Sequence, residues 1–289
     1  MKPISTAESR AIVSPELPSA ARIIERDIRD ALARGDGRPI VIGLCGAQGS
    51  GKSTAAAQVH AALTADGIRS VALSLDDFYL TSAERTALGE AVHSLLRTRG
   101  VPGTHDVALA MTMLDLLQSG EPVRLPCFDK TRDERATTAQ WQVAPAGVQV
   151  ILFEGWCVGA RPQSDAALAE PVNALEAEQD RSGSWRRFVN DQLAGPYQRL
   201  FARLDRLVLL EAPGFEVVGA WRTEQEEGLR RETGNGVWAG MSDAEIHTFI
   251  QHYERLTRHI LDEMPRRADL VITLDEKRAV IRAKHAAYI

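Results

Sequence analysis

The chain reads Ile40-Val41-Ile42-Gly43-Leu44-Cys45-Gly46-Ala47-Gln48-Gly49-Ser50-Gly51-Lys52-Ser53 close to its start, and the architecture follows from this segment. Its first half is an apolar run typical of a buried strand, and its second half fits the phosphate-loop pattern G-x-x-x-x-G-K-[S/T]. Apolar positions at helical spacing follow at Ala56, Val59 and Leu63. A Gly-rich turn with an accidental lysine is the alternative, but it explains neither the strand nor the helix. The segment therefore predicts a phosphate site at a helix N-terminus.

Within this loop, two side chains have the chemistry that a nucleotide requires. Lys52 is expected to reach the β- and γ-phosphates, and the Ser53 hydroxyl is expected to ligate the magnesium ion that accompanies them. The ligands predicted are ATP and Mg²⁺. The predicted nucleotide contacts are Gly46, Ala47, Gln48, Gly49, Ser50, Gly51, Lys52, Ser53 and Thr54.

Composition restricts the remaining possibilities. The 289 residues are 44% hydrophobic and 25% charged, with a formal net charge of -5, which argues against a sequence-independent grip on nucleic acid. Three widely spaced cysteines suggest neither a disulfide framework nor a zinc site. No signal-peptide core and no apolar stretch of membrane-spanning length is present. We expect a soluble cytoplasmic protein without a membrane partner, whose oligomeric state the sequence leaves open.

Apolar runs separated by helix-period segments organise the chain. Strands separated by helices imply a parallel sheet covered on both faces, which is a three-layer α/β/α architecture. We expect an N-terminal helical extension over 1–38 with a helix at Ala20–Arg34, and one domain over 39–289 with a helical insertion at 159–204. The predicted strands are 40–45, 70–75, 148–153, 206–210 and 270–274.

Two carboxylates, Asp76 and Asp77, follow the second predicted strand. A kinase for a small hydroxylated substrate needs a carboxylate opposite the γ-phosphate, to orient the hydroxyl and accept its proton. The alternative is that both aspartates only cap the next helix. Because parallel strands place their ligands beyond their carboxyl ends, we assign the catalytic role to Asp76. Its loss should reduce turnover more than ATP binding.

Glu154 ends the third strand, at the position where phosphate-loop enzymes hold magnesium or its water. We expect it to organise the metal together with Ser53. The alternative is a strand-end carboxylate with a purely structural role.

Basic side chains gather between the second and third strands of a chain that is acidic overall. Arginine binds a carboxylate well because its planar fork donates two parallel hydrogen bonds, so the cluster predicts a small anionic acceptor. A solvated surface, with arginines paired to Asp106, Asp129 or Asp133, is the alternative. The predicted acceptor contacts are Asp76, Tyr79, Arg99, His105, Lys130 and Arg135.

A lid is predicted at 219–240, after the fourth strand. An arginine brought in by lid closure would stabilise charge on the transferring phosphoryl group and help to exclude water. Arg222 is the first candidate for this third catalytic role, beside Lys52 and Asp76. Its alternative is a helical ion pair with Glu226 at i, i+4.

With these motifs the sequence resembles the D-glycerate 3-kinase family, the plant and fungal type of glycerate kinase. The resemblance implies kinship with pantothenate kinase, uridine kinase and phosphoribulokinase, a five-stranded parallel sheet flanked by helices, and Asp76 as the base. It also implies that Phe128-Asp129 with Arg135 lies at the acceptor. The motifs that carry it are Gly43–Ser53, Leu75-Asp76-Asp77-Phe78-Tyr79, Arg99–Asp106, Phe128-Asp129-Lys130, Glu154-Gly155-Trp156, Pro171-Val172-Asn173-Ala174-Leu175-Glu176 and Trp221–Glu226.

The function expected is therefore the ATP- and Mg²⁺-dependent phosphorylation of D-glycerate to 3-phosphoglycerate. A kinase for another small metabolite, such as pantothenate or a nucleoside, is the alternative among enzymes. An ATP-hydrolysing switch module is the alternative outside them.

Overall fold

A computed structural model describes residues 18–233 and 242–286, so that the start of the predicted N-terminal extension and residues 234–240 of the predicted lid lie outside the described residues. The main α-helices are α1 Ala20–Arg34, α2 Lys52–Ala65, α3 Ser82–Ala91, α4 Val107–Gln118, α5 Ala174–Gln179, α6 Ser184–Gln192, α7 Gln198–Phe201, α8 Glu216–Thr233 and α9 Asp243–Glu263. The strands are β1 Ile40–Gly46, β2 Ser70–Ser74, β3 Val123–Leu125, β4 Phe128–Asp129, β5 Glu134–Arg135, β6 Gln142–Ala144, β7 Val150–Gly155, β8 Arg206–Glu211, β9 Leu270–Leu274 and β10 Val280–His285.

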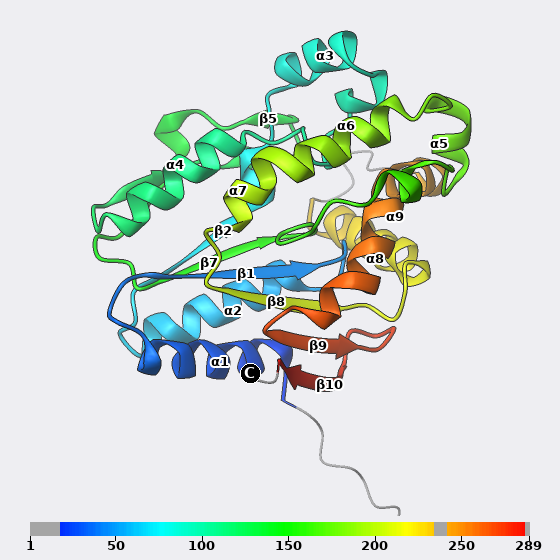
Figure 1. The fold of residues 1–289 in the computed structure, drawn as a ribbon. Coiled ribbons are helices and arrows are strands. Elements are labelled where there is room, and N and C mark those ends of the chain that lie inside the picture. Colours follow the sequence, from blue (N-terminus) through cyan, green and yellow to red (C-terminus); the bar gives the residue numbers. More distant parts are fainter. Residues whose placement is uncertain (1–17, 234–241, 287–289) are drawn as a thin grey trace, which may run out of the picture.

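The central sheet has the strand order β10-β9-β8-β1-β7-β2 (Figure 1). All neighbouring pairs are parallel except β9 and β10. The five parallel strands coincide with the five predicted apolar runs, which confirms the α/β prediction. The sixth strand, β10, was not predicted, because it is an edge strand with mostly exposed residues and lacks a continuous apolar run.

Helices cover both faces of this sheet, as the buried runs require. Alternate residues of β1 belong to different core clusters: Val41 packs with α4, α7 and α9, and Ile42 packs with α1, α2 and α8. In α1, Ile24 and Ile28 are fully buried in the second cluster. The helix of the predicted N-terminal extension thus forms part of the core.

The register of the sheet brings the predicted site residues together at one edge. Glu154 on β7 is paired with Leu44 on β1 and with Ser74 on β2. The phosphate loop follows β1, and the 3₁₀ turn that contains Asp76 follows β2. Because all three strands are parallel, their carboxyl ends converge here.

Two short antiparallel ribbons, β3 with β6 and β4 with β5, lie outside the main sheet. The β4–β5 hairpin carries Lys130 between its strands. The predicted insertion at 159–204 contains α5, α6 and α7, with Pro196 inside the π-helical turn Leu193–Tyr197. Within residues 18–233 and 242–286, no helix combines the length and the apolar character that a membrane crossing requires.

Candidate active site

The phosphate loop depends on its glycines for both conformation and space. Gly49 and Gly51 have φ angles of 74° and 87°, a region that glycine enters without steric cost. A Cβ atom on Gly49 would lie 2.6 Å from the Cβ of Trp221 on α8. Gly51 is the N-cap of α2, and no described side chain caps this end of the helix. The first-turn N–H groups and the positive end of the helix dipole are therefore available to an anion.

Lys52 and Ser53 both meet Glu154 beside this loop. The Ser53 hydroxyl donates a hydrogen bond to Glu154 Oε1 at 2.8 Å, and Lys52 Nζ lies 4.0 Å from Glu154 Oε2. Glu154 is only 4% exposed, and its Oε2 atom has no hydrogen-bond partner among the described residues. Strand order thus brings together a hydroxyl and a buried carboxylate, both of them hard oxygen donors.

Asp76 is held by two donors at the opposite side of the same space. Lys130 Nζ donates to Asp76 Oδ2 at 2.6 Å, and the Tyr79 hydroxyl donates to Oδ1 at 2.9 Å. Burial alone would raise the pKa of Asp76, but the charges of Lys130 and Lys52 hold it well below its usual value. The carboxylate is therefore ionised at neutral pH and fixed in orientation.

Asp77 points away from this space, toward the β4–β5 hairpin. Its Oδ1 accepts a hydrogen bond from the Phe128 N–H at 3.1 Å. Burial and the nearby Asp76 charge raise the pKa of Asp77 to about 6, although the Phe128 N–H opposes the shift. Of the two aspartates, Asp77 thus has the structural position.

The predicted acceptor contacts occupy two layers. Tyr79, Arg99 and Lys130 line one cavity with Asp76. Arg99 is also paired with Asp133, and its guanidinium lies 5.6 Å from the centre of the Phe128 ring. The pairing of basic side chains with carboxylates, which we considered as the alternative to an acceptor-binding role, is therefore present. The same basic side chains nevertheless face the cavity.

His105 and Arg135 lie behind Tyr79 and do not line that cavity. The imidazole of His105 stacks on the Tyr79 ring with centroids 4.5 Å apart, and its Nδ1 lies 2.6 Å from the Tyr197 hydroxyl. Burial lowers the pKa of His105 to about 4, so this ring is neutral at pH 7. Arg135 donates to the Tyr79 carbonyl at 3.1 Å and lies 3.4 Å from Asp106. Both residues support Tyr79 from behind.

Arg222 projects from α8 into the cavity. It pairs with Glu226 at 2.7 Å and donates to the Gln225 side chain at 2.9 Å. Its guanidinium also lies 5.6 Å from the centre of the Phe249 ring. The i, i+4 ion pair expected as the alternative is thus present in a side chain that also lines the cavity.

The cavity between phosphate loop and Asp76 has a volume of about 100 Å³. Sequence reasoning did not assign Trp156, Gln225, Phe249 and Tyr253 to it. Phe249 and Tyr253 are spaced i, i+4 on α9, but this spacing is equally typical of a core-facing stripe. The residues that line the cavity are Gln48, Gly49, Lys52, Ser53, Asp76, Tyr79, Arg99, Lys130, Trp156, Arg222, Gln225, Phe249 and Tyr253.

Arg278, in the turn between β9 and β10, is a further contact that the sequence did not indicate. Its Nε donates to the Gly49 carbonyl at 2.5 Å, and Nη1 pairs with Glu224 of α8 at 2.6 Å. The guanidinium lies 5.1 Å from the centre of the Trp221 ring. Its φ of 67° is uncommon for a residue with a side chain. This turn therefore ties the phosphate loop to α8.

Comparison with known proteins agrees with this geometry. A profile of the Phosphoribulokinase / Uridine kinase family matches residues 41–161. An uncharacterised kinase of Schizosaccharomyces pombe is 37% identical over 227 residues, which are 75% of this chain and 79% of that protein. A chloroplastic D-glycerate 3-kinase of Arabidopsis thaliana is 29% identical over 263 residues, which are 85% of this chain and 54% of that protein.

Among solved structures, a D-glycerate 3-kinase of Cryptococcus neoformans superposes with a TM-score of 0.79 at 25% identity, covering 93% of this chain and 100% of that one. The expected kinship with the phosphate-loop kinases is thereby confirmed. The chain belongs to the same kinase family as the Schizosaccharomyces pombe protein, contains a Phosphoribulokinase / Uridine kinase family domain over residues 41–161, and is an ATP-dependent phosphotransferase.

Proposed function

We propose that this kinase transfers the γ-phosphate of ATP to a hydroxyl group of D-glycerate and releases 3-phosphoglycerate and ADP. One observation carries the proposal: Lys52 of the phosphate loop, the carboxylate of Asp76 and the cations Arg99, Lys130 and Arg222 all line a single small cavity. Phosphoryl donor, acceptor hydroxyl and acceptor carboxylate would each meet a suitable group there.

The size of the cavity favours a small acceptor. Its volume of about 100 Å³ lies below the ~300–1,000 Å³ of typical ligand pockets. A three-carbon acid suits such a space better than pantothenate or a nucleoside. Its carboxylate would be bound by cationic side chains, whose charge-assisted hydrogen bonds are stronger than neutral ones. The two D-glycerate 3-kinases among the relatives support the same acceptor.

Magnesium fits the oxygen pair of Ser53 and Glu154. Glu154 Oε2 is buried without a hydrogen-bond partner among the described residues, and Lys52 Nζ lies 4.0 Å away, so a donor or a closer cation is still needed to offset the cost of burying this oxygen. The Ser53 hydroxyl and Glu154 would hold the ion directly or through its waters. When bound, Mg²⁺ neutralises charge on the phosphate oxygens.

The remaining groups position the reactants. The backbone of Gly46–Thr54 would hold the triphosphate, so that the acceptor oxygen attacks the γ-phosphorus while the bond to the leaving ADP oxygen breaks. Asp76 receives the hydroxyl proton. Because its low pKa makes it a weak base, its main contribution is to orient the hydroxyl, which suffices for a loose transition state. Arg222 would stabilise charge on the transferring phosphoryl group.

The test is ADP release measured with D-glycerate, pantothenate and uridine as separate acceptors. We expect stimulation by D-glycerate, with 3-phosphoglycerate as the phosphorylated product. Stimulation by pantothenate or uridine instead would replace the acceptor and keep the kinase mechanism. ATP hydrolysis that no acceptor stimulates would favour the switch module.

A further inference from the structure

The segment Pro171–Glu176, one of the motifs behind the glycerate-kinase resemblance, has no described side chain in the acceptor cavity. It forms the start of α5, where the Asn173 side chain caps the helix by accepting from the Glu176 N–H at 3.0 Å. Its polar groups instead contact α9. The motif therefore requires a role other than direct contact with the acceptor.

Five hydrogen bonds join this segment to one turn of α9, one of them from Asn173 Nδ2 to Glu254 at 3.2 Å. Asn173 Nδ2 donates to the Gln251 carbonyl at 2.9 Å, and the Leu175 N–H donates to the Gln251 side chain at 2.8 Å. Glu176 accepts two hydrogen bonds from Arg255, from Nε at 2.8 Å and from Nη2 at 2.6 Å. Glu176 is fully buried and Arg255 is 8% exposed. Such a paired, buried fork fixes both distance and angle between its helices.

Arg255 also binds the backbone of the insertion. Its Nη1 donates to the Ala167 carbonyl at 2.6 Å, and Nη2 donates to the Glu170 carbonyl at 2.5 Å. Every nitrogen of this guanidinium is thus engaged by the segment between Ala167 and Glu176. A lysine could not reproduce this set, because it presents a single charged point instead of a fork.

The same helix supplies a wall of the acceptor cavity through Phe249 and Tyr253. The Tyr253 hydroxyl donates to the Arg99 carbonyl at 3.1 Å. Its ring meets Trp156 edge to face at 4.8 Å. A Cβ atom on Gly100 would lie 2.0 Å from the Tyr253 hydroxyl, so the contact has no room for adjustment. A shift of α9 would therefore move this wall and the backbone of Arg99 with it.

We propose that Glu176 and Arg255 are a positioning pair for the acceptor: the insertion holds α9 through them, and α9 sets the aromatic wall and Arg99. This inference rests on the proposed function, since it assumes that the acceptor occupies this cavity. It assigns to the insertion a task in acceptor recognition without contact to the acceptor.

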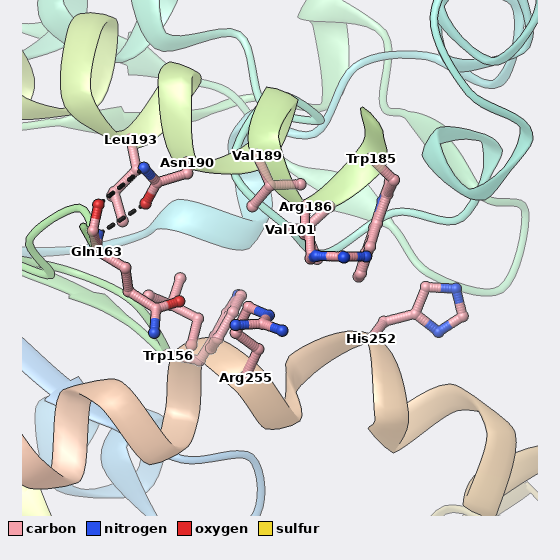
Figure 2. A pocket seen from close by; sticks show the side chains of 11 residues that line it. Val101, Trp156, Gln163, Trp185, Arg186, Val189, Asn190, Leu193, His252 and Arg255 are labelled. Carbon is pink, nitrogen blue, oxygen red and sulfur yellow. Dashed lines mark hydrogen bonds between the residues drawn. The ribbon is translucent and has the colours of Figure 1, made fainter. Parts of the chain in front are cut away.

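A matched control lies beside Arg255. Figure 2 shows Arg186 and Arg255 at the same small cavity, near Trp156. Arg186 is buried too, pairs with Asp180 at 3.0 Å and donates to the carbonyls of Leu168 and Ala169. These partners of Arg186 all belong to the insertion itself. The two arginines thus share chemistry and burial, but only Arg255 is on α9.

The experiment compares R255K with R186K in the full chain. We expect R255K to raise the KM for the acceptor by roughly 10-fold or more, because small misplacements of binding groups are costly, with the KM for ATP changed less than about 2-fold. R186K should leave both constants within about 2-fold, even where it lowers the unfolding midpoint as much. Equal effects of the two variants on the acceptor KM, or none from R255K, would overturn the proposal.

Two additions separate the possible failures. E176Q keeps the size of Glu176 and covers the case that R255K does not fold: it should raise the acceptor KM above the wild-type value by more than R186K does. If the wild type ignores D-glycerate, the proposed function fails. The positioning role of Glu176 and Arg255 is then tested by amide hydrogen exchange. R255K should speed exchange in the peptide 249–256 more than R186K does. Equal exchange rates in the two variants would contradict the positioning role.

Discussion

The phosphate side of this site is contained in one segment, Gly46–Thr54, whereas the acceptor side takes its side chains from positions spread between Asp76 and Tyr253. The phosphate side uses backbone N–H groups and a helix end, which any sequence that permits the loop conformation supplies. The acceptor side uses side chains that lie on several segments far apart in the sequence. The two sides should therefore respond differently to substitution, and the following predictions test that difference.

The largest expected effect is from D76N. Turnover should fall by ~10³-fold, because the hydroxyl loses its oriented proton acceptor. The KM for ATP should stay within about 2-fold, since Asp76 faces the acceptor. Steady-state kinetics with both substrates varied measures this. D77N is the control: its amide oxygen can still accept the Phe128 N–H, so turnover should change less than about 3-fold. Equal losses in both variants would mean that Asp76 has no special role.

Removing the cation beside Asp76 should affect the acceptor alone. K130A should raise the KM for the acceptor by roughly 10- to 100-fold, the worth of a charge-assisted hydrogen bond. Because the Lys130 charge lowers the pKa of Asp76, its loss raises that pKa. The acid limb of the kcat/KM profile should then move to higher pH. The control is R132A, on the same hairpin but outside the cavity, which should change neither the acceptor KM nor the acid limb of the kcat/KM profile. If R132A shifts the acid limb as K130A does, the effect is due to the overall charge of the hairpin.

On the phosphate side, R278A should weaken ATP binding by roughly 5- to 20-fold, because the Gly49 carbonyl loses a charged donor and α8 loses its tie to the loop. The KM for the acceptor should remain within about 2-fold. R282A is the control: this exposed neighbour lies 3.7 Å from Glu211 and does not reach the loop. Equilibrium ATP titration compares the two. If R278A raises the KM for the acceptor more than it weakens ATP binding, the phosphate side and the acceptor side of the site do not respond independently.

The last prediction concerns stability against acid, where two buried groups have opposite effects. The pKa of His105 is about 4 in the folded chain and near 6.5 when exposed, so only the unfolded chain takes up this proton between those values. The free energy of unfolding then falls by up to ~3 kcal/mol as pH decreases through that window. Asp77 opposes this below about pH 6, because its raised pKa lets the folded chain keep a proton that the unfolded chain releases.

Two variants separate the opposing groups. H105Q should lose less stability than the wild type between pH 6.5 and 4, and D77N should lose more. Urea unfolding at several pH values measures both slopes. If the free energy of unfolding depends on pH in the same way in the wild type, H105Q and D77N, then neither the His105 imidazole nor the Asp77 carboxyl has the pKa shift assigned to it.

Some of the acceptor side was accessible from sequence and some was not. Asp76, Lys130 and Arg222 were predicted because each follows a motif or a strand end, and all three reach the cavity. Arg99 and His105 belong to one motif, Arg99–Asp106, but Arg99 lines the cavity whereas His105 lies behind Tyr79. Residue type and spacing place a side chain near a site, but they do not distinguish a lining residue from one that packs behind it.

Long-range packing explains the contacts that were missed. Tyr253 joins the cavity only because α9 crosses the sheet edge, held by Glu176 and Arg255. Arg278 meets Gly49 across 229 positions of sequence. Tyr253 follows Phe249 at i, i+4, a spacing that fits a core-facing stripe equally well, and Arg278 belongs to no local pattern, so the sequence could assign neither residue to the site.

By itself, the sequence determined the five parallel strands and the phosphate loop, because buried strands and glycine-dependent loops are local consequences of hydrophobic periodicity and backbone sterics. Only the tertiary structure decided which cations face the acceptor, which aromatic residues enclose it and how the insertion contributes. Those choices depend on the distance and rotation between helices, which are set by packing among residues far apart in the chain.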